Sequence, residues 1–193
     1  MIHRLIFLLV ALTAMMPSSA HCQEIALKTN LLYDALLTPN IGVEIEVAPK
    51  WSVDLSGNYN SWAIDGKKWK HWLVQPEARY WLCQPFGGHF FGIHALTGQA
   101  NVGHIDLDFK FLNTDFRKLK DHRYQGWYGG AGIAYGYSWL LGRHWNIEAE
   151  IGIGWIHFDY DRYECDGCGR KDGSGTHDYF GPTKAAMAIV YVF

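Results

Sequence analysis

Eight stretches of the chain alternate apolar residues with polar or small ones, and this alternation constrains the fold more than any other feature. A period of two places successive side chains on opposite faces of an extended strand. In the stretch WNIEAEIGIGWI, Ile147 and Ile151 share one face, and Glu148 and Glu150 share the other. Pro76 interrupts the fourth stretch, so we expect a bulge or an unpaired position there. The predicted strands are 25–32, 41–48, 51–59, 71–82, 90–98, 126–139, 145–156 and 184–193.

The connections between these strands alternate in length. The short ones are 49–50, 83–88 and 140–144, and the long ones are 33–39, 61–70, 101–125 and 159–182. An even number of strands with short turns at one end and long loops at the other is typical of outer-membrane barrels. The predicted fold class is all-β: an eight-stranded antiparallel up-and-down transmembrane β-barrel with short periplasmic turns and long extracellular loops.

One face of the predicted strands is polar and charged at its centre. An eight-stranded barrel has an interior just wide enough for side chains, and glycines on the same face leave room for the charged ones. We expect a lumen charge cluster that acts as a structural plug, with a narrow cation path as the alternative; buried charges must be paired or hydrated in either case. Its predicted members are Lys28, Glu44, Glu46, Asp54, Glu77, Arg79, Glu148, Glu150 and Lys184.

The other face is apolar, with aromatic residues at the strand ends, which is typical of the girdles at two membrane interfaces. At the long-loop end the predicted girdle contains Tyr59, Trp72, Trp127 and Trp155. At the short-turn end it contains Trp51, Trp145, Tyr191 and Phe193. The chain ends on Phe193 in mid-strand, which resembles the terminal signal that barrel assembly machinery reads. The alternative is a soluble barrel whose aromatic residues fill the core.

The first 22 residues predict a secretory signal peptide: a basic start, an apolar run from Leu5 to Met16, and small residues after it. We expect cleavage after Ala20 or Cys22, which leaves residues 23–193 as one outer-membrane barrel domain. The bulky His21 argues against a lipid anchor on Cys22. The predicted location is the cell outer membrane.

Two cysteines lie in the last long connection, in the stretch YECDGCGRKDGSG. Outside the cytoplasm, Cys165 and Cys168 are expected to form a local disulfide. A zinc site that adds His157 and His177 is the alternative. Cys83 is expected to stay unpaired, and we expect no cofactor and no metal.

Catalysis and nucleic-acid binding both find little support. His157 and Asp159 share a face near the long-loop end, but the sequence places no serine nucleophile beside them, so we expect no catalytic residues. A formal net charge of −2 excludes a general nucleic-acid footprint.

The stretch TDFRKLKDHRY predicts a short helix with Thr114 as its N-cap. Its basic residues are Arg117, Lys118, Lys120 and Arg123. We expect this stretch to be a solvated surface segment, and contact of these residues with anionic lipopolysaccharide or a partner is the alternative.

Four stretches carry a resemblance to a known family: LKTNLLYDALLTPNIGVEIEVAPKWSVDLSGNYN, KHWLVQPEARYWLC, GHFFGIHALTGQANVG and YGGAGIAYGYSWLLGRHWNIEAEIGIGW. They resemble the Bacteroidetes domain of unknown function family DUF3575. The resemblance implies a secreted or outer-membrane protein similar to small OmpA-type barrels, with genes near those of fimbrillin-like surface proteins. The expected function is therefore non-enzymatic: a structural or interaction component linked to a fimbria-like assembly. The alternatives are a lipid-modifying barrel enzyme and a soluble periplasmic β-domain.

Overall fold

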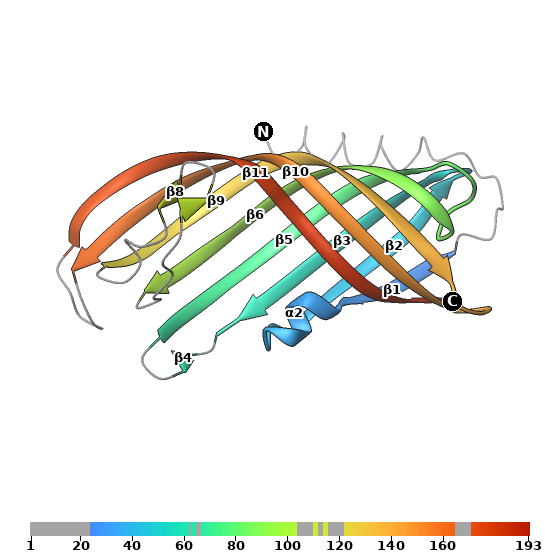
Figure 1. The fold of residues 1–193 in the computed structure, drawn as a ribbon, viewed down its shortest axis with the longest axis horizontal. Coiled ribbons are helices and arrows are strands. Elements are labelled where there is room, and N and C mark those ends of the chain that lie inside the picture. The colour runs from blue at the N-terminus through green and yellow to red at the C-terminus, as the bar shows by residue number, and fades with distance from the viewer. Residues whose placement is uncertain are drawn as a thin grey trace, which may run out of the picture.

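The computed structural model describes residues 24–61, 63–64, 67–103, 110–111, 114–115, 122–164 and 171–193. Eight antiparallel strands form one sheet in chain order, and the pairs β1–β11 and β3–β5 close it into a ring (Figure 1). The predicted eight-stranded antiparallel barrel is therefore confirmed. The ring strands are β1 (Ile25–Asn30), β2 (Asn40–Ala48), β3 (Trp51–Asn60), β5 (Lys67–Trp81), β6 (Gly88–Gly103), β9 (His122–Leu140), β10 (Trp145–Glu164) and β11 (Lys171–Val192).

The ring strands differ greatly in length. β1 has 6 residues and β11 has 22, so β10 and β11 extend beyond the other strands at the long-loop end (Figure 1). The prediction of a long loop over 159–182 is wrong, because β10 continues to Glu164 and β11 begins at Lys171. Both faces of this projecting hairpin carry polar residues, so the apolar alternation that reveals a strand stops at Trp155 although the pairing continues.

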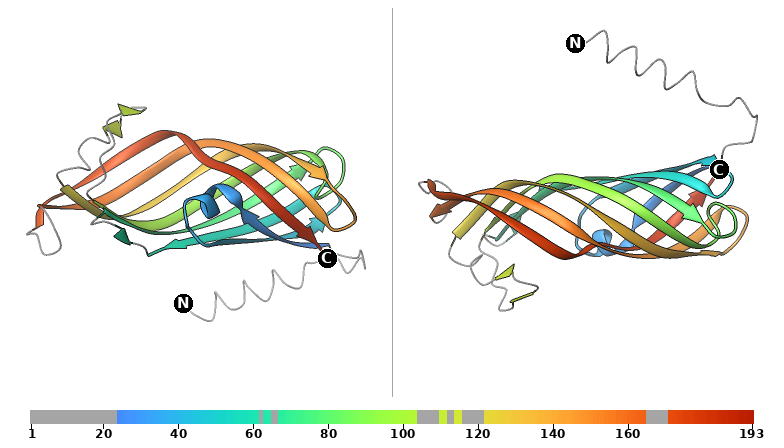
Figure 2. Two further views of the ribbon diagram at one scale, coloured as in Figure 1. Left: turned by 60° about the horizontal axis from the view of Figure 1, so that its bottom comes forward. Right: turned by 90° about the horizontal axis from the view of Figure 1, so that it is seen from above.

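A short helix follows β1 where two further strand residues are predicted. α2 (Leu31–Ala35) begins because Asn30 leaves the strand and its side chain accepts a hydrogen bond from the Leu32 N–H. The Asn30 amide also donates to the carbonyl of Ala185. α2 therefore lies against β11, part-way along the barrel (Figure 2, left). On the side where β1 pairs, the residues of β11 that precede Met187 have no strand partner among the described residues.

Two local irregularities shape the ring. The ladder between β5 and β6 omits Gln75 and Pro76, as the proline predicts. Between β10 and β11 the register shifts after Gly152, which pairs with Lys184, while Ile153 pairs with Pro182. The extra residue, Thr183, is a β-bulge that the sequence did not reveal.

Three minor strands lie outside the ring: β4 (Ala63–Ile64), β7 (Lys110–Phe111) and β8 (Thr114–Asp115). Because Thr114 and Asp115 pair with β7, the predicted helix start at Thr114 is wrong. The rest of that basic stretch, up to residue 121, lies outside the described residues. Among the residues that the structure describes, no helix is long and apolar enough to cross a membrane.

Burial in this barrel is inverted relative to a soluble protein. Glu44 is 0% exposed and Arg79 is 1% exposed, whereas Ile93 is 70% and Ile151 is 61% exposed. The ring strands turn their charged residues and most of their small residues inward, and most of their aliphatic residues outward. The barrel interior is therefore the polar compartment of the molecule, as predicted, and the outer wall is its apolar surface.

Candidate functional site: the barrel interior

Arg79 lies at the centre of the interior and contacts four carboxylates. Its Nε donates to Glu77 Oε1 at 2.7 Å, and its Nη1 donates to Glu44 Oε2 at 2.9 Å and to Glu148 Oε1 at 2.8 Å. Its Nη2 donates to Glu150 Oε2 at 2.7 Å. These acids come from β2, β5 and β10, so one guanidinium connects distant parts of the ring. Its planar array of five donors suits this task better than an ammonium group.

Lys28 adds a second cation from β1. Its Nζ pairs with Glu44, lies 3.3 Å from Glu148 Oε1, and lies 3.6 Å from Asp54 Oδ1. The lysine is buried, and Gly42 stands directly opposite it on β2. The absence of a side chain at Gly42 leaves room for the lysine stem.

Lys184 supplies the third cation from β11, next to the bulge. Its Nζ pairs with Glu77 and lies 3.1 Å from Glu150 Oε1. The neighbouring Thr183 hydroxyl lies 2.9 Å from His94 Nε2 on β6. The bulge therefore lets two successive residues of β11 reach the interior, one to the acids and one to the histidine.

The structure brings eight of the nine predicted lumen charges into one network. Glu46 is the exception: it is half-buried near the short-turn end and makes no ion pair with any described residue. It shares the inward parity of Glu44 but lies one pair closer to the end of β2, where the ring opens to solvent. The alternation of inward and outward residues alone therefore could not distinguish a central position on a strand from a terminal one.

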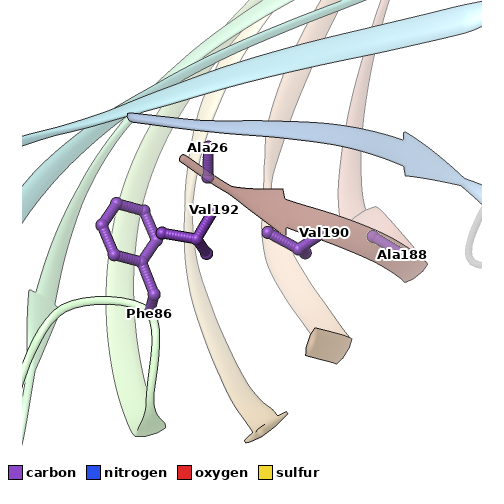
Figure 3. Packing of buried hydrophobic residues seen from close by; sticks show 5 residues of the cluster. All are labelled: Ala26, Phe86, Ala188, Val190 and Val192. Atoms are coloured by element: carbon purple, nitrogen blue, oxygen red, sulfur yellow. The ribbon is translucent and has the colours of Figure 1, made fainter. Parts of the chain in front are cut away.

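Aromatic side chains fill the interior between Arg79 and the short-turn end, and the predicted interior residues did not include them. Trp81 and Phe90 are fully buried with ring centroids 4.6 Å apart, and the Arg79 guanidinium lies 4.4 Å from the Phe90 centroid. Phe86 comes from the β5–β6 turn and folds into the barrel end beside Val192 (Figure 3). The inward parity of Trp81 and Phe90 was a signal that could have revealed them.

The turn that carries Phe86 is fixed by hydrogen bonds from the wall. Ser138 Oγ donates to the Phe86 carbonyl at 2.9 Å, and Asn146 Nδ2 donates to the same oxygen at 2.8 Å. Phe86 has a φ of 64°, which is unusual for a bulky residue. Both donors are buried, so the short-turn end is closed by a turn that the barrel itself holds in place.

Above the charged network the interior is lined by aromatic residues and glycines. Tyr128 packs on Phe158 at 5.7 Å, and Tyr124 packs on Tyr160 at 5.4 Å. The Tyr128 hydroxyl crosses Gly98 and donates to the carbonyl of Trp72. A cavity of about 550 Å³ lies at this end, between β3, β5, β6, β9 and β10.

The outer rim of the long-loop end holds a histidine–carboxylate pair. His157 Nδ1 lies 2.8 Å from Asp178 Oδ1, and Trp155 Nε1 donates to the same oxygen at 3.2 Å. The hydrogen bond from His157 lowers the pKa of the Asp178 carboxyl below its usual value. His157 and Asp159 lie on the same face of β10, as predicted, but the carboxylate beside His157 is that of Asp178, and Asp159 lies opposite Trp127 and Thr176.

The same geometry counts against the alternative zinc site. His177 pairs with Phe158 in the ladder, so it lies on the opposite face of the hairpin from His157. The two histidines therefore cannot converge on one ion. Among the described residues, no group of three His, Cys, Asp or Glu side chains is placed to hold a metal.

Aromatic residues occupy both ends of the outer wall. At the short-turn end, Trp145 packs on Tyr191 at 4.9 Å and Tyr191 packs on Phe193 at 5.0 Å. Trp51 packs on Tyr80 at 5.1 Å. At the other end Trp72 and Trp127 meet edge to face, and Tyr59 and Trp155 are exposed. The Phe193 N–H donates to Ile25, so the last residue belongs to the closed ring.

Comparison with known families identifies the chain. A family model described as a protein of unknown function, DUF3575, matches residues 5–193. The chain belongs to the DUF3575 family. No curated protein and no solved structure shows a significant match to it.

Several predicted features of this DUF3575 member lie outside the described residues. They are the signal peptide with its cleavage site at Ala20 or Cys22, the cysteine pair Cys165 and Cys168, and the basic residues Arg117, Lys118 and Lys120. Arg123 belongs to β9, but its side chain is not described. Cys83 is an exposed free cysteine at the short-turn end.

Proposed function

We propose that this protein is a non-enzymatic outer-membrane β-barrel, with the short turns in the periplasm and the β10–β11 hairpin at the cell surface. The inverted burial carries the proposal. On the eight ring strands, no described outward side chain between the two aromatic rows is Asp, Glu, Lys or Arg. A soluble barrel would turn this aliphatic wall inward, whereas a membrane barrel needs it outside.

The interior supports a structural role rather than transport. Arg79 and its four acids fill the lumen at mid-height, and the plug of Trp81, Phe86 and Phe90 closes it below. The charged network and the aromatic plug block the lumen one after the other, so the described residues leave no continuous passage through the barrel. An eight-stranded barrel has little lumen to spare, and here that lumen is filled by side chains that join opposite walls.

The proposed partners are outer-membrane lipid and lipopolysaccharide, the barrel assembly machinery, and a fimbria-like or adhesive surface assembly. The aromatic residues Tyr191 and Phe193, which pack together on the outer wall, support the second of these. The projecting β10–β11 hairpin, with polar residues on both faces, supports a contact beyond the membrane. The fimbrial link rests on the genetic context that the family resemblance implies.

The lipid-modifying alternative has one observation in its favour, the exposed His157–Asp178 pair. Among the residues that the structure describes, no serine hydrogen-bonds to this pair, and the Ser138 hydroxyl donates to Phe86 at the opposite end of the barrel. Mass analysis of lipid A from cells with and without the protein tests this alternative, and a changed acyl pattern would support it.

Labelling of a single cysteine tests the membrane assignment. Ile151→Cys, in a background without the native cysteines, should react in intact outer membranes with a lipid-soluble maleimide and resist an impermeant one. Ser174→Cys is the matched control, because Ser174 is exposed on the projecting part of β11. Equal reaction of both variants with the impermeant reagent would show that the apolar wall meets water.

A further inference from the structure

The buried network holds more acidic than basic groups. Its three cations are Lys28, Arg79 and Lys184, and its five carboxylates are those of Glu44, Asp54, Glu77, Glu148 and Glu150. Three of the acids are direct neighbours across the sheet, since Glu44 pairs with Asp54 and Asp54 pairs with Glu77. Like charges placed opposite each other on adjacent strands destabilise a sheet. An additional positive charge would therefore stabilise the network.

The shortage of positive charge is concentrated at Asp54. The nearest cationic nitrogens are Lys28 Nζ at 3.6 Å and Arg79 Nη2 at 4.0 Å, both beyond hydrogen-bond distance. Asp54 is 2% exposed, and its Oδ1 accepts no hydrogen bond. Asn58 Oδ1, four residues further along β3 on the same face, and Gln75 Nε2 are also buried without a partner. A buried polar atom without a partner loses its hydration without a compensating hydrogen bond, so three such atoms along one chamber indicate a ligand that satisfies them.

All three unpaired groups line the same chamber. It holds about 50 Å³ and is bounded by the charged network below and by Tyr33 of α2 at its side. One water molecule needs roughly 10–15 Å³ by this measure, so the chamber has room for a few waters or for an ion with part of its hydration shell. A sugar or a nucleotide would not fit.

The donor set identifies the class of ligand. A carboxylate oxygen and an amide oxygen are hard ligands, which suit Mg²⁺ or Na⁺ rather than a transition metal. The described residues contain no three-residue His, Cys, Asp or Glu cluster for full coordination. An ion that keeps several of its waters needs only one or two protein carboxylates, and Gln75 Nε2 can donate to such a water.

We infer that this chamber binds one hydrated hard cation, Mg²⁺ or Na⁺, with Asp54 Oδ1 as its direct ligand and Asn58 Oδ1 accepting a hydrogen bond from one of its waters. The ion enters from the long-loop side, where β11 loses its strand partner and Asn30, Tyr33 and Asn40 border the chamber. It cannot leave through the short-turn end, because Arg79 and the aromatic plug lie below. The interior therefore binds a cation without conducting it.

Unfolding of the detergent-solubilised barrel tests this inference. The denaturation midpoint is measured at constant ionic strength with MgCl2, NaCl or choline chloride, because choline is too large for the chamber. A ligand that binds only the folded state raises the folding equilibrium constant by a factor of 1 + [L]/Kd. We expect the folding equilibrium constant to rise in Mg²⁺ or Na⁺, about elevenfold at ten times Kd and in proportion to the cation concentration beyond that, and not to rise in choline.

Two variants locate the effect. Asp54→Asn should abolish the difference between the cations, whereas Glu46→Gln, which removes an acid outside the network on the neighbouring strand, should keep it. Should Asp54→Asn not fold, Asn58→Ala removes the acceptor of an ion-bound water without a change of charge and should raise several-fold the cation concentration needed for a given stabilisation. Identical unfolding of the parent protein in all three salts would overturn the inference. A midpoint that responds to pH but to no salt would also overturn it, because protons would then supply the missing charge.

Discussion

The two halves of the barrel interior are built from different chemistry. The short-turn half, from Arg79 down to Phe86, contains buried ion pairs and a packed aromatic plug. In the long-loop half the charged pairs lie at the surface: Arg162 Nη2 meets Asp172 at 2.6 Å with both side chains about one-third exposed or more. The boundary lies where β1 ends at Asn30 and α2 begins.

This difference shows how ring closure controls which interactions can be buried. Where all eight strands pair, water is excluded and each charge must find a partner within the wall. Beyond Lys184, toward the long-loop end, β11 has no strand on the side of β1, water reaches the side chains, and surface pairs contribute little. We therefore expect the free energy of unfolding to be concentrated in the short-turn half.

The largest expected effect comes from Arg79. Arg79→Ala leaves four buried carboxylates without their common partner, and the expected loss of stability is about 3–5 kcal/mol. The matched control is Arg162→Ala, which removes an arginine from an exposed pair and should cost about 0–1 kcal/mol. Urea unfolding of both variants in detergent provides the measurement. Equal midpoints for the two variants would show that the lower network is hydrated and that the halves do not differ.

The second effect concerns the outer wall at the height of the network. Ile151 points outward between Tyr135 and Ala185. If this wall meets lipid near the bilayer midplane, Ile151→Arg should cost roughly 2–4 kcal/mol, because the guanidinium draws water or head groups into hydrocarbon. Ser174→Arg on the projecting hairpin should be close to neutral. Unfolding in lipid vesicles measures both, and a neutral Ile151→Arg would place the wall in water.

Glycine substitutions compare packing in the two halves. A side chain at Gly136 would collide with the Phe90 ring, which Trp81 and Arg79 hold in place, so Gly136→Ala should cost about 1–3 kcal/mol. At Gly175 the nearest atom is the Tyr160 hydroxyl at 3.1 Å, the far end of a side chain that can move. Gly175→Ala should therefore fall within about 0.5 kcal/mol of the parent. Thermal unfolding followed by gel mobility distinguishes the two, and equal losses would contradict a looser long-loop half.

The sequence predicted the short-turn half better than the long-loop half, for a physical reason. Below Asn30 one face of each strand is apolar and the other polar, so a period of two reveals both the strand and its orientation. That is why Glu44, Arg79 and Glu148 were placed inside correctly. In the β10–β11 hairpin the outward face becomes polar and aromatic residues such as Phe158 and Tyr160 lie inward, so the apolar outer face ends and 159–182 was predicted as a loop.

Other features depend on long-range contacts that the alternation along a strand does not show. The plug residue Phe86 lies in a turn, and only the donors Ser138 and Asn146 bring it into the lumen. The partner of His157 is Asp178 because the bulge at Thr183 sets the register of the hairpin. A register shift of one residue exchanges inward and outward faces, and nothing in the local sequence fixed its position.

The smallest expected effect concerns that His157–Asp178 pair and should remain local. Because the hydrogen bond lowers the pKa of Asp178 in the folded state, its contribution is present above the unfolded pKa of an aspartate and is lost as pH falls through the lower folded value. In His157→Ala, Asp178 should titrate at a higher pH than in the parent, as followed by carboxyl NMR shifts. The urea midpoint of the whole barrel should not change, because the pair lies in the exposed long-loop half. An unchanged titration would show that the hydrogen bond does not persist in solution, and a large loss of global stability would show that the hairpin contributes to the closed ring below it.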